Sequence, residues 1–305
     1  MLKFALKRLA FTPLSLLFVS LVSFCVLRVT GNPIDTYLDV NRTDEQVAAL
    51  TARLHLDQPL PVQFLIYLKD LLRGDFGDSL QFGGPALYVV LERAGASIEL
   101  LIASLLLTVS VGILTGVLCS IFKDRFVDLI VSTLAVASQS MPSFWLGILL
   151  IQFFAVKAQI LPTSGRGGIS HLVLPAVTLA AYLLPNIVLI TRTSMLETLR
   201  EQFTVTALAK GLSRKRMIFL HALPNALNPI ISFVGLQIGR LMGGAIITET
   251  IFAWPGIGRL MVGSIFQRDV PVVIAGIVII SLVIVLANLA VDLLLSVNDP
   301  RVRLD

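Results

Sequence analysis

The sequence is dominated by long apolar runs, and these constrain its fold more than any other feature. Five are uncharged and one is interrupted by a single arginine; the six are residues 9–27, 100–122, 129–156, 172–191, 229–248 and 270–291. A helix of about 20 apolar residues crosses a bilayer, whereas a water-soluble domain needs no such runs. Hydrophobic residues make up 56% of the chain and charged residues 14%, a balance unlike that of soluble domains. We predict an all-α polytopic membrane protein with six transmembrane helices.

Two of the runs depart from a plain membrane helix. The run 129–156 is longer than one crossing needs and contains Met141-Pro142, so we expect a kinked or tilted helix with some of its length outside the hydrocarbon. The run 229–248 contains Arg240, and a charged side chain at membrane depth is expected to face protein or water.

Basic residues are distributed unevenly between the loops. Three precede the first run, two follow the second, six lie between Arg192 and Arg216, and two lie in the tail, whereas the short loops on the other side carry four. Because short cytoplasmic loops are enriched in Lys and Arg, both termini and the loop after the fourth run are predicted to be cytoplasmic. The segment between the first two runs is also basic, but loops of that length cross membranes largely regardless of charge.

The first run and the cysteines have ordinary explanations. The run 9–27 has a basic start but is long for a signal peptide and lacks a small-residue cleavage site, so we interpret it as a retained anchor. Cys25 and Cys119 both lie inside apolar runs and are expected to be small buried hydrophobes. The net charge of +5 is explained by loops beside anionic lipid, so we predict no nucleic-acid partner.

No catalytic centre is visible in the sequence. No lysine follows a glycine, which excludes the phosphate-binding G-x-x-x-x-G-K-[ST] motif. His55, His171 and His221 stand far apart, without the spacing of metal ligands. We therefore predict that the chain is not an enzyme and holds no metal or cofactor, and that it acts as a conduit, receptor or scaffold.

The basic loop after the fourth run has the pattern of two helices joined by a tight turn. Leu196, Leu199 and Phe203 form one apolar stripe of a helix predicted to reach Lys210. Gly211 suits a left-handed C-terminal cap, and Ser213 can cap a second helix that leads back to the membrane. From these physical arguments alone, the loop is as well explained by a purely topological role as by a docking role.

The same loop carries a motif. Ala207-Leu208-Ala209-Lys210-Gly211 is followed by His221-Ala222-Leu223-Pro224-Asn225 and then by Pro229. This spacing resembles the EAA loop of ABC import permeases, in particular the family that imports dipeptides, oligopeptides and nickel. Leu208 and Pro224 stand where arginines are common in that family, a departure that bears on the choice of ATPase.

The resemblance extends over nearly the whole chain. The family's other motifs recur in order at 56–63, 72–77, 140–145, 249–259 and 299–303. Asn32 and Val270 depart from the usual G-D-P and R-D-Y-P motifs. The resemblance implies a type I ABC importer permease fold, a second homologous permease subunit in a heterodimer, one or two cytoplasmic ATPases and an extracytoplasmic substrate-binding protein. It also implies a prokaryotic cytoplasmic (inner) membrane.

The resemblance further implies that the loop 192–228 couples ATP hydrolysis to transport. Its turn would be a coupling helix that fits a groove in the ATPase. The ATPase-coupling candidates are Thr206, Ala207, Leu208, Ala209, Lys210, Gly211, Leu212 and His221.

Polar residues inside the runs are candidates for a translocation path, since they are costly against lipid. The candidates are the polar residues Gln139, Asn186, Gln237 and Arg240, together with Pro142. An ion pair would explain Arg240 equally well. Gly235, Gly239 and Gly243 recur at every fourth position, which favours close helix packing.

We divide the chain into an N-terminal tail and first helix (1–30), an outer segment (31–94), and a five-helix core (95–305). Helical spacing at Phe64, Tyr67 and Leu71, with Pro59 before them, predicts short outer helices. This segment is either a platform for the binding protein or a cover for the helix ends.

We predict that the cargo is a dipeptide or short oligopeptide. Nickel, bare or chelated, and other small solutes are the alternative, although the runs lack the ligand clustering of a bare nickel site. A passive channel remains a further alternative, and it would not require ATP.

Overall fold

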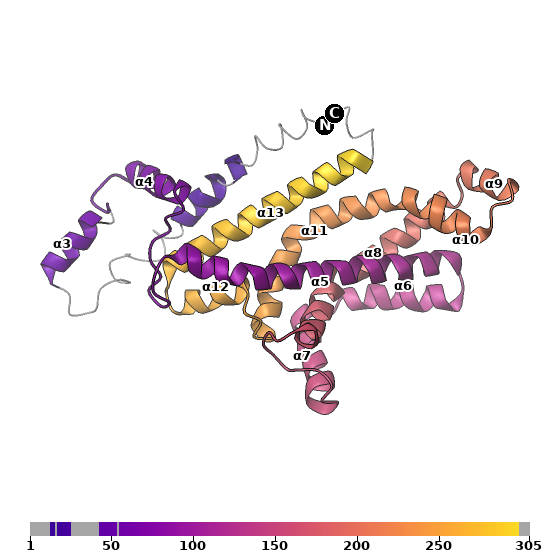
Figure 1. Ribbon diagram of the computed structural model, residues 1–305, viewed down its shortest axis with the longest axis horizontal. Coiled ribbons are helices and arrows are strands. Elements are labelled where there is room, and N and C mark those ends of the chain that lie inside the picture. The colour runs from indigo at the N-terminus through magenta and orange to yellow at the C-terminus, as the bar shows by residue number, and fades with distance from the viewer. Residues whose placement is uncertain (1–12, 16, 26–42, 54, 299–305) are drawn as a thin grey trace.

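The computed structural model describes residues 13–15, 17–25, 43–53 and 55–298, and within these ranges every regular element is helical (Figure 1). The outer segment contains α3 and α4, and the rest of the chain contains α5 to α13. Their bounds are α3 Asp44–Arg53, α4 Leu60–Leu72, α5 Ala86–Ile121, α6 Phe126–Gln139, α7 Ser143–Leu150, α8 Ile169–Thr198, α9 Gln202–Ala209, α10 Arg214–Arg216, α11 Leu223–Ile251, α12 Ile257–Phe266 and α13 Val270–Asn298. Two π-helical stretches, Ile151–Lys157 and Met217–Ala222, continue α7 and join α10 to α11. The all-α prediction is confirmed for the described residues.

Four helical stretches are long and apolar enough to cross a membrane: 86–121, 169–198, 214–251 and 270–291. The bent pair 126–139 and 143–157 raises the number to five if it counts as one span. The predicted run 9–27 lies partly outside the described residues, although 17–25 are helical. Six spans and the placement of both termini therefore stay predictions.

The bend in the third run is sharper than the kink we predicted, because the chain bends by 109° between α6 and the helical stretch 143–157. Pro142 lies at the N-terminus of α7 with an extended backbone. Proline cannot donate a backbone hydrogen bond and disfavours helical geometry in the residue before it. The run is thus two helices at a corner rather than one tilted helix.

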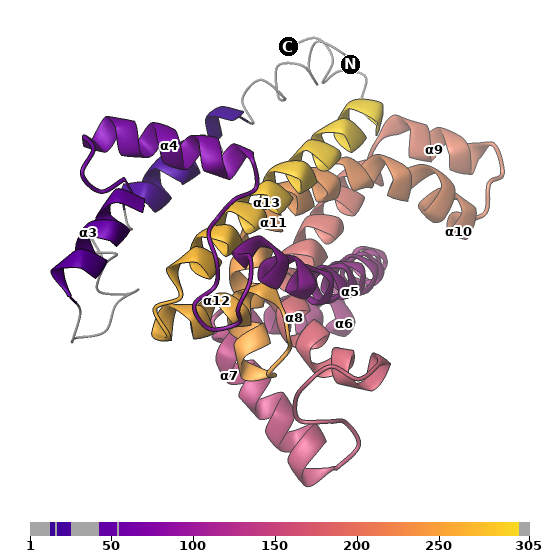
Figure 2. The same cartoon turned by 60° about the vertical axis from the view of Figure 1, so that its left-hand side comes forward.

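Helices α5 and α8 form the centre of the molecule, and α11 and α13 pack beside them (Figure 2). Gly112 and Gly116 allow the closest approach, since a Cβ on either would lie 2.5 Å from Ile187 or Thr191 of α8. Leu100, Leu183 and Trp254 belong to a buried cluster in this centre. These two glycine contacts thus set the separation between α5 and α8, and that separation determines where the ends of the two helices lie relative to each other.

The predicted glycine face of α11 is only partly a packing face. A Cβ on Gly235 would collide with Val291 of α13, and one on Gly239 would lie 3.8 Å from Ile284. A Cβ on Gly243 would meet nothing within 4 Å. Gly243 therefore borders open space rather than a neighbouring helix of this chain.

The outer segment contains the predicted short helices, with Pro59 directly before α4. Phe64 and Tyr67 of α4 pack against Phe24, with ring centroids 5.4 and 5.7 Å away. Burial raises the pKa of Tyr67 to about 12, so its phenol stays neutral at physiological pH. In Figure 1, α3 and α4 lie at the opposite end of the molecule from α9 and α10.

Candidate functional site

The loop between α8 and α11 folds into a short helix and a tight turn. The amide of Gly211 donates to Leu208 O at 2.9 Å, and that of Leu212 donates to Ala207 O at 3.2 Å. Gly211 has φ +86°, the left-handed region that a residue with a Cβ rarely adopts. The predicted glycine turn is confirmed in geometry.

The helix that we predicted from Leu196 to Lys210 is interrupted, so that prediction is wrong in part. α8 ends at Thr198 and α9 begins at Gln202. The Thr204 hydroxyl donates to Leu199 O at 3.0 Å and to Glu201 O at 2.6 Å. These bonds satisfy the carbonyl at the C-cap of α8 and bind the one at the N-cap of α9, which stabilises the corner between the two helices.

Ser213 stands at the N-cap position of α10, as predicted, but its side chain makes no capping hydrogen bond. From Arg214 the chain stays helical to Ile251. The second helix of the loop is therefore continuous with the membrane helix α11, so a force on the turn acts directly on α11.

One side of the loop is anchored and the other is exposed. Ala207 packs against a buried cluster that includes Met195 and Met217. Val205 is 63% exposed and Leu208 44% exposed. An exposed apolar surface in a basic loop is suited to docking a protein partner.

The other coupling candidates also lie on or beside this surface. Thr206, Ala209, Lys210, Gly211 and His221 are exposed, and Leu212 is half-buried. The Thr206 hydroxyl donates to Gln202 O at 2.9 Å, and the Asn225 amide donates to His221 O at 2.7 Å. These polar side chains bond to their own helical turns, so they shape the loop rather than supply a chemical group.

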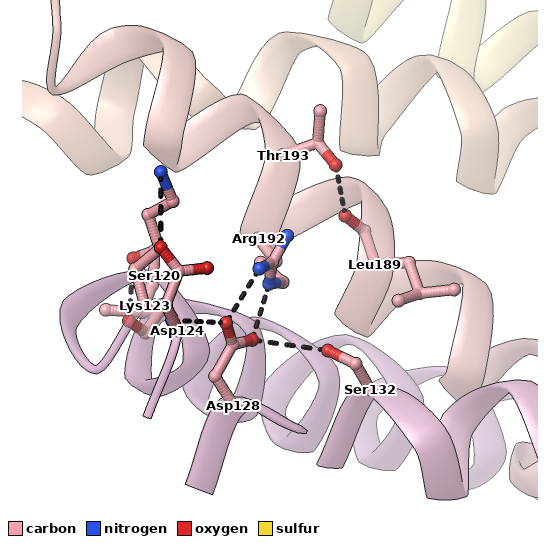
Figure 3. A network of polar contacts seen from close by, with 9 residues as sticks. Ser120, Lys123, Asp124, Asp128, Ser132, Leu189, Arg192 and Thr193 are labelled. Carbon is pink, nitrogen blue, oxygen red and sulfur yellow. Dashed lines mark hydrogen bonds and ion pairs between the residues drawn. The ribbon is translucent and has the colours of Figure 1, made fainter. Parts of the chain in front are cut away.

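A buried ion pair secures α6 to α8 (Figure 3). Arg192 donates from Nε to Asp128 Oδ1 at 2.5 Å and from Nη2 to Oδ2 at 2.7 Å. Ser132 and the amide of Asp124 also donate to the Asp128 carboxylate. Asp128 is only 3% exposed. From the sequence we counted Arg192 only as a basic loop residue; an acid and a base at the ends of neighbouring runs were the available signal.

The motif 249–259 folds around a second buried carboxylate. Glu249 Oε1 accepts from the Ser97 hydroxyl at 2.6 Å, and Oε2 accepts from the amide of Arg259 at 3.0 Å. The Trp254 indole donates to Ala96 O at 2.8 Å. A Cβ on Gly256 would collide with the Glu249 carboxylate. The motif thus fastens the α11–α12 turn to α5, a role that sequence reasoning missed.

The outer segment is fixed to the α12–α13 turn through a third carboxylate. Asp269 Oδ2 accepts from the Ser79 hydroxyl at 2.6 Å and from the amide of Gln81 at 3.2 Å. A Cβ on Gly77 would lie 3.7 Å from Pro271. These contacts tie the outer loop to the turn between α12 and α13.

The path candidates are not all brought together. Arg240 Nη1 donates to Gln237 Oε1 at 3.4 Å, and both lie on α11. Gln139 and Pro142 lie at the α6–α7 corner, where Pro142 lines an open hollow of about 490 Å³. Asn186 is half-buried in α8. Among the described residues, no group of three or more His, Cys, Asp and Glu side chains is placed to hold a metal ion.

The described helices include four that are long and apolar enough to cross a membrane, as a membrane transport component requires, and comparison with known proteins agrees. Residues 109–304 match the binding-protein-dependent transport system inner membrane component family, and residues 1–112 match the N-terminal membrane component of the same systems. The chain belongs to this family of ABC importer permeases. It is a transport subunit rather than an ATP-binding one.

Its relatives match over almost their whole length. The di/tripeptide transport system permease protein DppB of Pseudomonas aeruginosa is 37% identical over 99% of both chains. The dipeptide permease DppB of Escherichia coli is 35% identical over 99% of both chains. The glutathione transport system permease protein GsiC of Salmonella choleraesuis is 37% identical, again over 99% of both chains.

A solved structure shares the fold. The inward-facing MetNI methionine ABC transporter superposes with a TM-score of 0.58 at 17% identity, over 70% of this chain and 97% of that chain. This likeness shows the shared fold, and the family predicted from the motifs is confirmed by the family match and the full-length relatives.

Proposed function

We propose that this chain is one of two permease subunits of an ATP-driven, binding-protein-dependent importer of dipeptides or short oligopeptides. The observation that carries the proposal is the full-length match to dipeptide permeases, at 35 to 37% identity. Glutathione is itself a tripeptide, so the GsiC match points to the same cargo class. The importer lies in the cytoplasmic membrane of a prokaryote with both termini of this chain in the cytoplasm, in accord with the basic loops.

The turn 206–212 is the docking element for a cytoplasmic ATPase. Leu208 and Val205 offer an exposed apolar surface, and Ala207 ties it to the ends of α5 and α8 through the buried cluster. The helical stretch from Arg214 to Ile251, which includes the π-helical Met217–Ala222 and Pro229, connects this turn to the membrane interior without a break. Closure of the ATPases would shift α11 as a body, which is what alternating access requires.

The outer segment 31–94 is the platform for the substrate-binding protein. Leu60, Leu65 and Leu72 of α4 are exposed apolar side chains, and such a patch favours a protein partner. The Ser79–Asp269 hydrogen bond would pass the effect of docking to α12 and α13. The other two parts of the chain are the tail with the first helix (1–30) and the five-helix core (95–305).

The path runs between this chain and a second, homologous permease, and Gln139, Pro142, Asn186, Gln237 and Arg240 are its candidate lining. The exposed α6–α7 corner and the exposed side of α11 are surfaces that the chain itself leaves uncovered. Polar groups at membrane depth belong on such water- or protein-facing surfaces rather than against lipid.

Uptake measurements test the cargo. Cells that lack this gene and cells complemented with it would be given an isotope-labelled dipeptide or radioactive nickel, each with unlabelled competitor and with or without an uncoupler of ATP supply. Loss and rescue of dipeptide uptake alone supports the proposal. Loss of nickel uptake alone contradicts it, and dipeptide flux that continues without ATP would indicate a channel.

A further inference from the structure

Arg240 is a charge in the middle of a membrane helix. It lies eight positions before Thr248, the predicted end of its apolar run, which is about 12 Å along a helix. Its side chain is exposed in this chain. A guanidinium at that depth is unfavourable against lipid tails, so it must face water or a polar group.

The surroundings of Arg240 differ from those of Arg192, which lies in the last part of α8. Arg192 meets a buried carboxylate through two short hydrogen bonds. Arg240 makes one long bond of 3.4 Å to the neutral amide of Gln237. No ion pair of Arg240 occurs among the described residues. Because a guanidinium carries five N–H donors, Arg240 retains most of its binding capacity.

The packing of α11 shows which side Arg240 occupies. Gly235 faces α13 and Gly244 faces Leu179 of α8. Between these two packed sides lies an uncovered stripe that includes Leu236, which is 81% exposed, and Gly243, where a Cβ would meet nothing within 4 Å. Arg240 lies on this stripe, next to the space that Gly243 leaves open.

The uncovered stripe carries polar residues along the length of α11, beside the exposed apolar side chains of Leu236 and Ile247. Asn225, Ser232 and Thr250 are exposed, and at 100° per residue they fall within a quarter turn of Arg240. The hydroxyls of Ser232 and Thr250 bond to carbonyl groups of their own helix. A lipid-facing stripe would be uniformly apolar, whereas intramembrane polar and charged residues mark substrate pathways.

We propose that Arg240 lines the translocation path and binds a carboxylate of the transported peptide, which makes it a specificity-determining residue. This inference rests on the proposed function, since an unmodified peptide carries a C-terminal carboxylate that is ionised at neutral pH. The planar guanidinium matches a carboxylate with two parallel hydrogen bonds. Gln237, which is 9% exposed, holds the guanidinium from the packed side, and Gly243 leaves room for the peptide.

Arg240→Gln and Arg240→Lys test the role in the assembled transporter, reconstituted in proteoliposomes with its binding protein. The Gln variant should lower the maximal uptake of labelled dipeptide about 10-fold, the effect of losing a charged hydrogen bond. ATP hydrolysis stimulated by loaded binding protein and the half-saturating peptide concentration should not change, because the binding protein sets them. Maximal uptake by the Arg240→Lys variant should lie between that of the wild type and that of the Arg240→Gln variant.

Charge restoration separates a binding role from a structural one. In a Cys25→Ala, Cys119→Ala background that retains uptake, the Arg240→Cys thiolate attacks an alkyl methanethiosulfonate, forms a mixed disulfide and releases methanesulfinate. The aminoethyl reagent restores a positive charge and should raise uptake. The sulfonatoethyl reagent, which adds a negative charge, should not.

Three outcomes would overturn the inference: wild-type uptake by Arg240→Gln, equal loss of uptake and ATP hydrolysis, or a thiol that reacts only after denaturation. The last would place Arg240 in a closed contact with the second permease. If the wild-type transporter itself moves no dipeptide, the proposed function fails instead.

Discussion

Breaking the Asp128–Arg192 ion pair should destabilise the protein strongly. Removing one partner of a buried pair leaves an uncompensated charge, which costs about 3–5 kcal/mol. The Asp128 side chain is 4% exposed but that of Arg192 is 25% exposed, so water can relieve part of the penalty and we expect about 3 kcal/mol. At roughly 2–4 °C per kcal/mol, Asp128→Ala should lower the unfolding midpoint by about 6–12 °C.

The assay is fluorescence-detected thermal unfolding of the purified transporter complex in detergent. Lys123→Gln is the matched control, because the Lys123–Asp124 ion pair is exposed, with 41% and 76% of the side chains accessible. Exposed pairs contribute about 0–1 kcal/mol. This variant should therefore unfold within a few degrees of wild type.

The double variant Asp128→Leu, Arg192→Met completes the test. It removes both charges together, so it should be more stable than Asp128→Ala alone. The reasoning is wrong if Asp128→Ala unfolds at the same temperature as Lys123→Gln. It is also wrong if the double variant loses as much stability as the sum of the losses caused by its two changes measured singly.

Three further changes test the loop, the buried carboxylate and the outer segment. Gly211→Arg should abolish ATP-driven uptake while the protein stays at its normal level in the membrane, because φ +86° disfavours a side chain and the arginine blocks the partner. Gly211→Asn, in which asparagine tolerates this φ, should keep most of the uptake. Normal uptake by Gly211→Arg would refute the coupling role. Gly256→Ala should lower the amount of folded protein, since its Cβ would collide with Glu249, whereas Gly263→Ala, with nothing within 4 Å, should not; equal expression of the two would contradict the packing argument. Deleting residues 43–57 should weaken pull-down of the binding protein more than that of the ATPase, and equal loss of both would indicate only a cover for the helix ends.

Local features were predictable from the sequence. The break at Pro142 and the turn at Gly211 follow from the backbone geometry of single residues. The placement of Phe64 and Tyr67 in a short helix follows from their helical spacing. The break before α9 was missed because it depends on one hydroxyl of Thr204 bonding to two carbonyls. Nothing in the apolar stripe distinguishes that corner from a continuous helix.

The buried carboxylates were not predictable. Asp128 and Arg192 are 64 positions apart, and Ser97 and Glu249 are 152 apart. Such pairs form only once the α5–α8 packing has placed the helix ends, and a sequence pattern gives no distance between helices. The geometry of the Gly211 turn was predicted because its motif is contiguous, whereas the open stripe of α11 depends on which neighbours cover it.

By itself, the sequence determined that this chain belongs in a membrane, predicted six runs long enough to cross it and the turn at Gly211, and carried the motifs of its family. Membrane placement depends on the transfer of contiguous residues between water and lipid, and the turn depends on local backbone geometry. The motifs are contiguous too, so none of these features needs the rest of the fold. Only the tertiary structure decided which charges form ion pairs and which glycines are covered by a neighbouring helix. It also decided that Arg240 lies on a side of α11 that no other described helix of this chain covers. Those outcomes depend on atomic separations across helices, because a charge at membrane depth is stable only where a partner or water comes within reach.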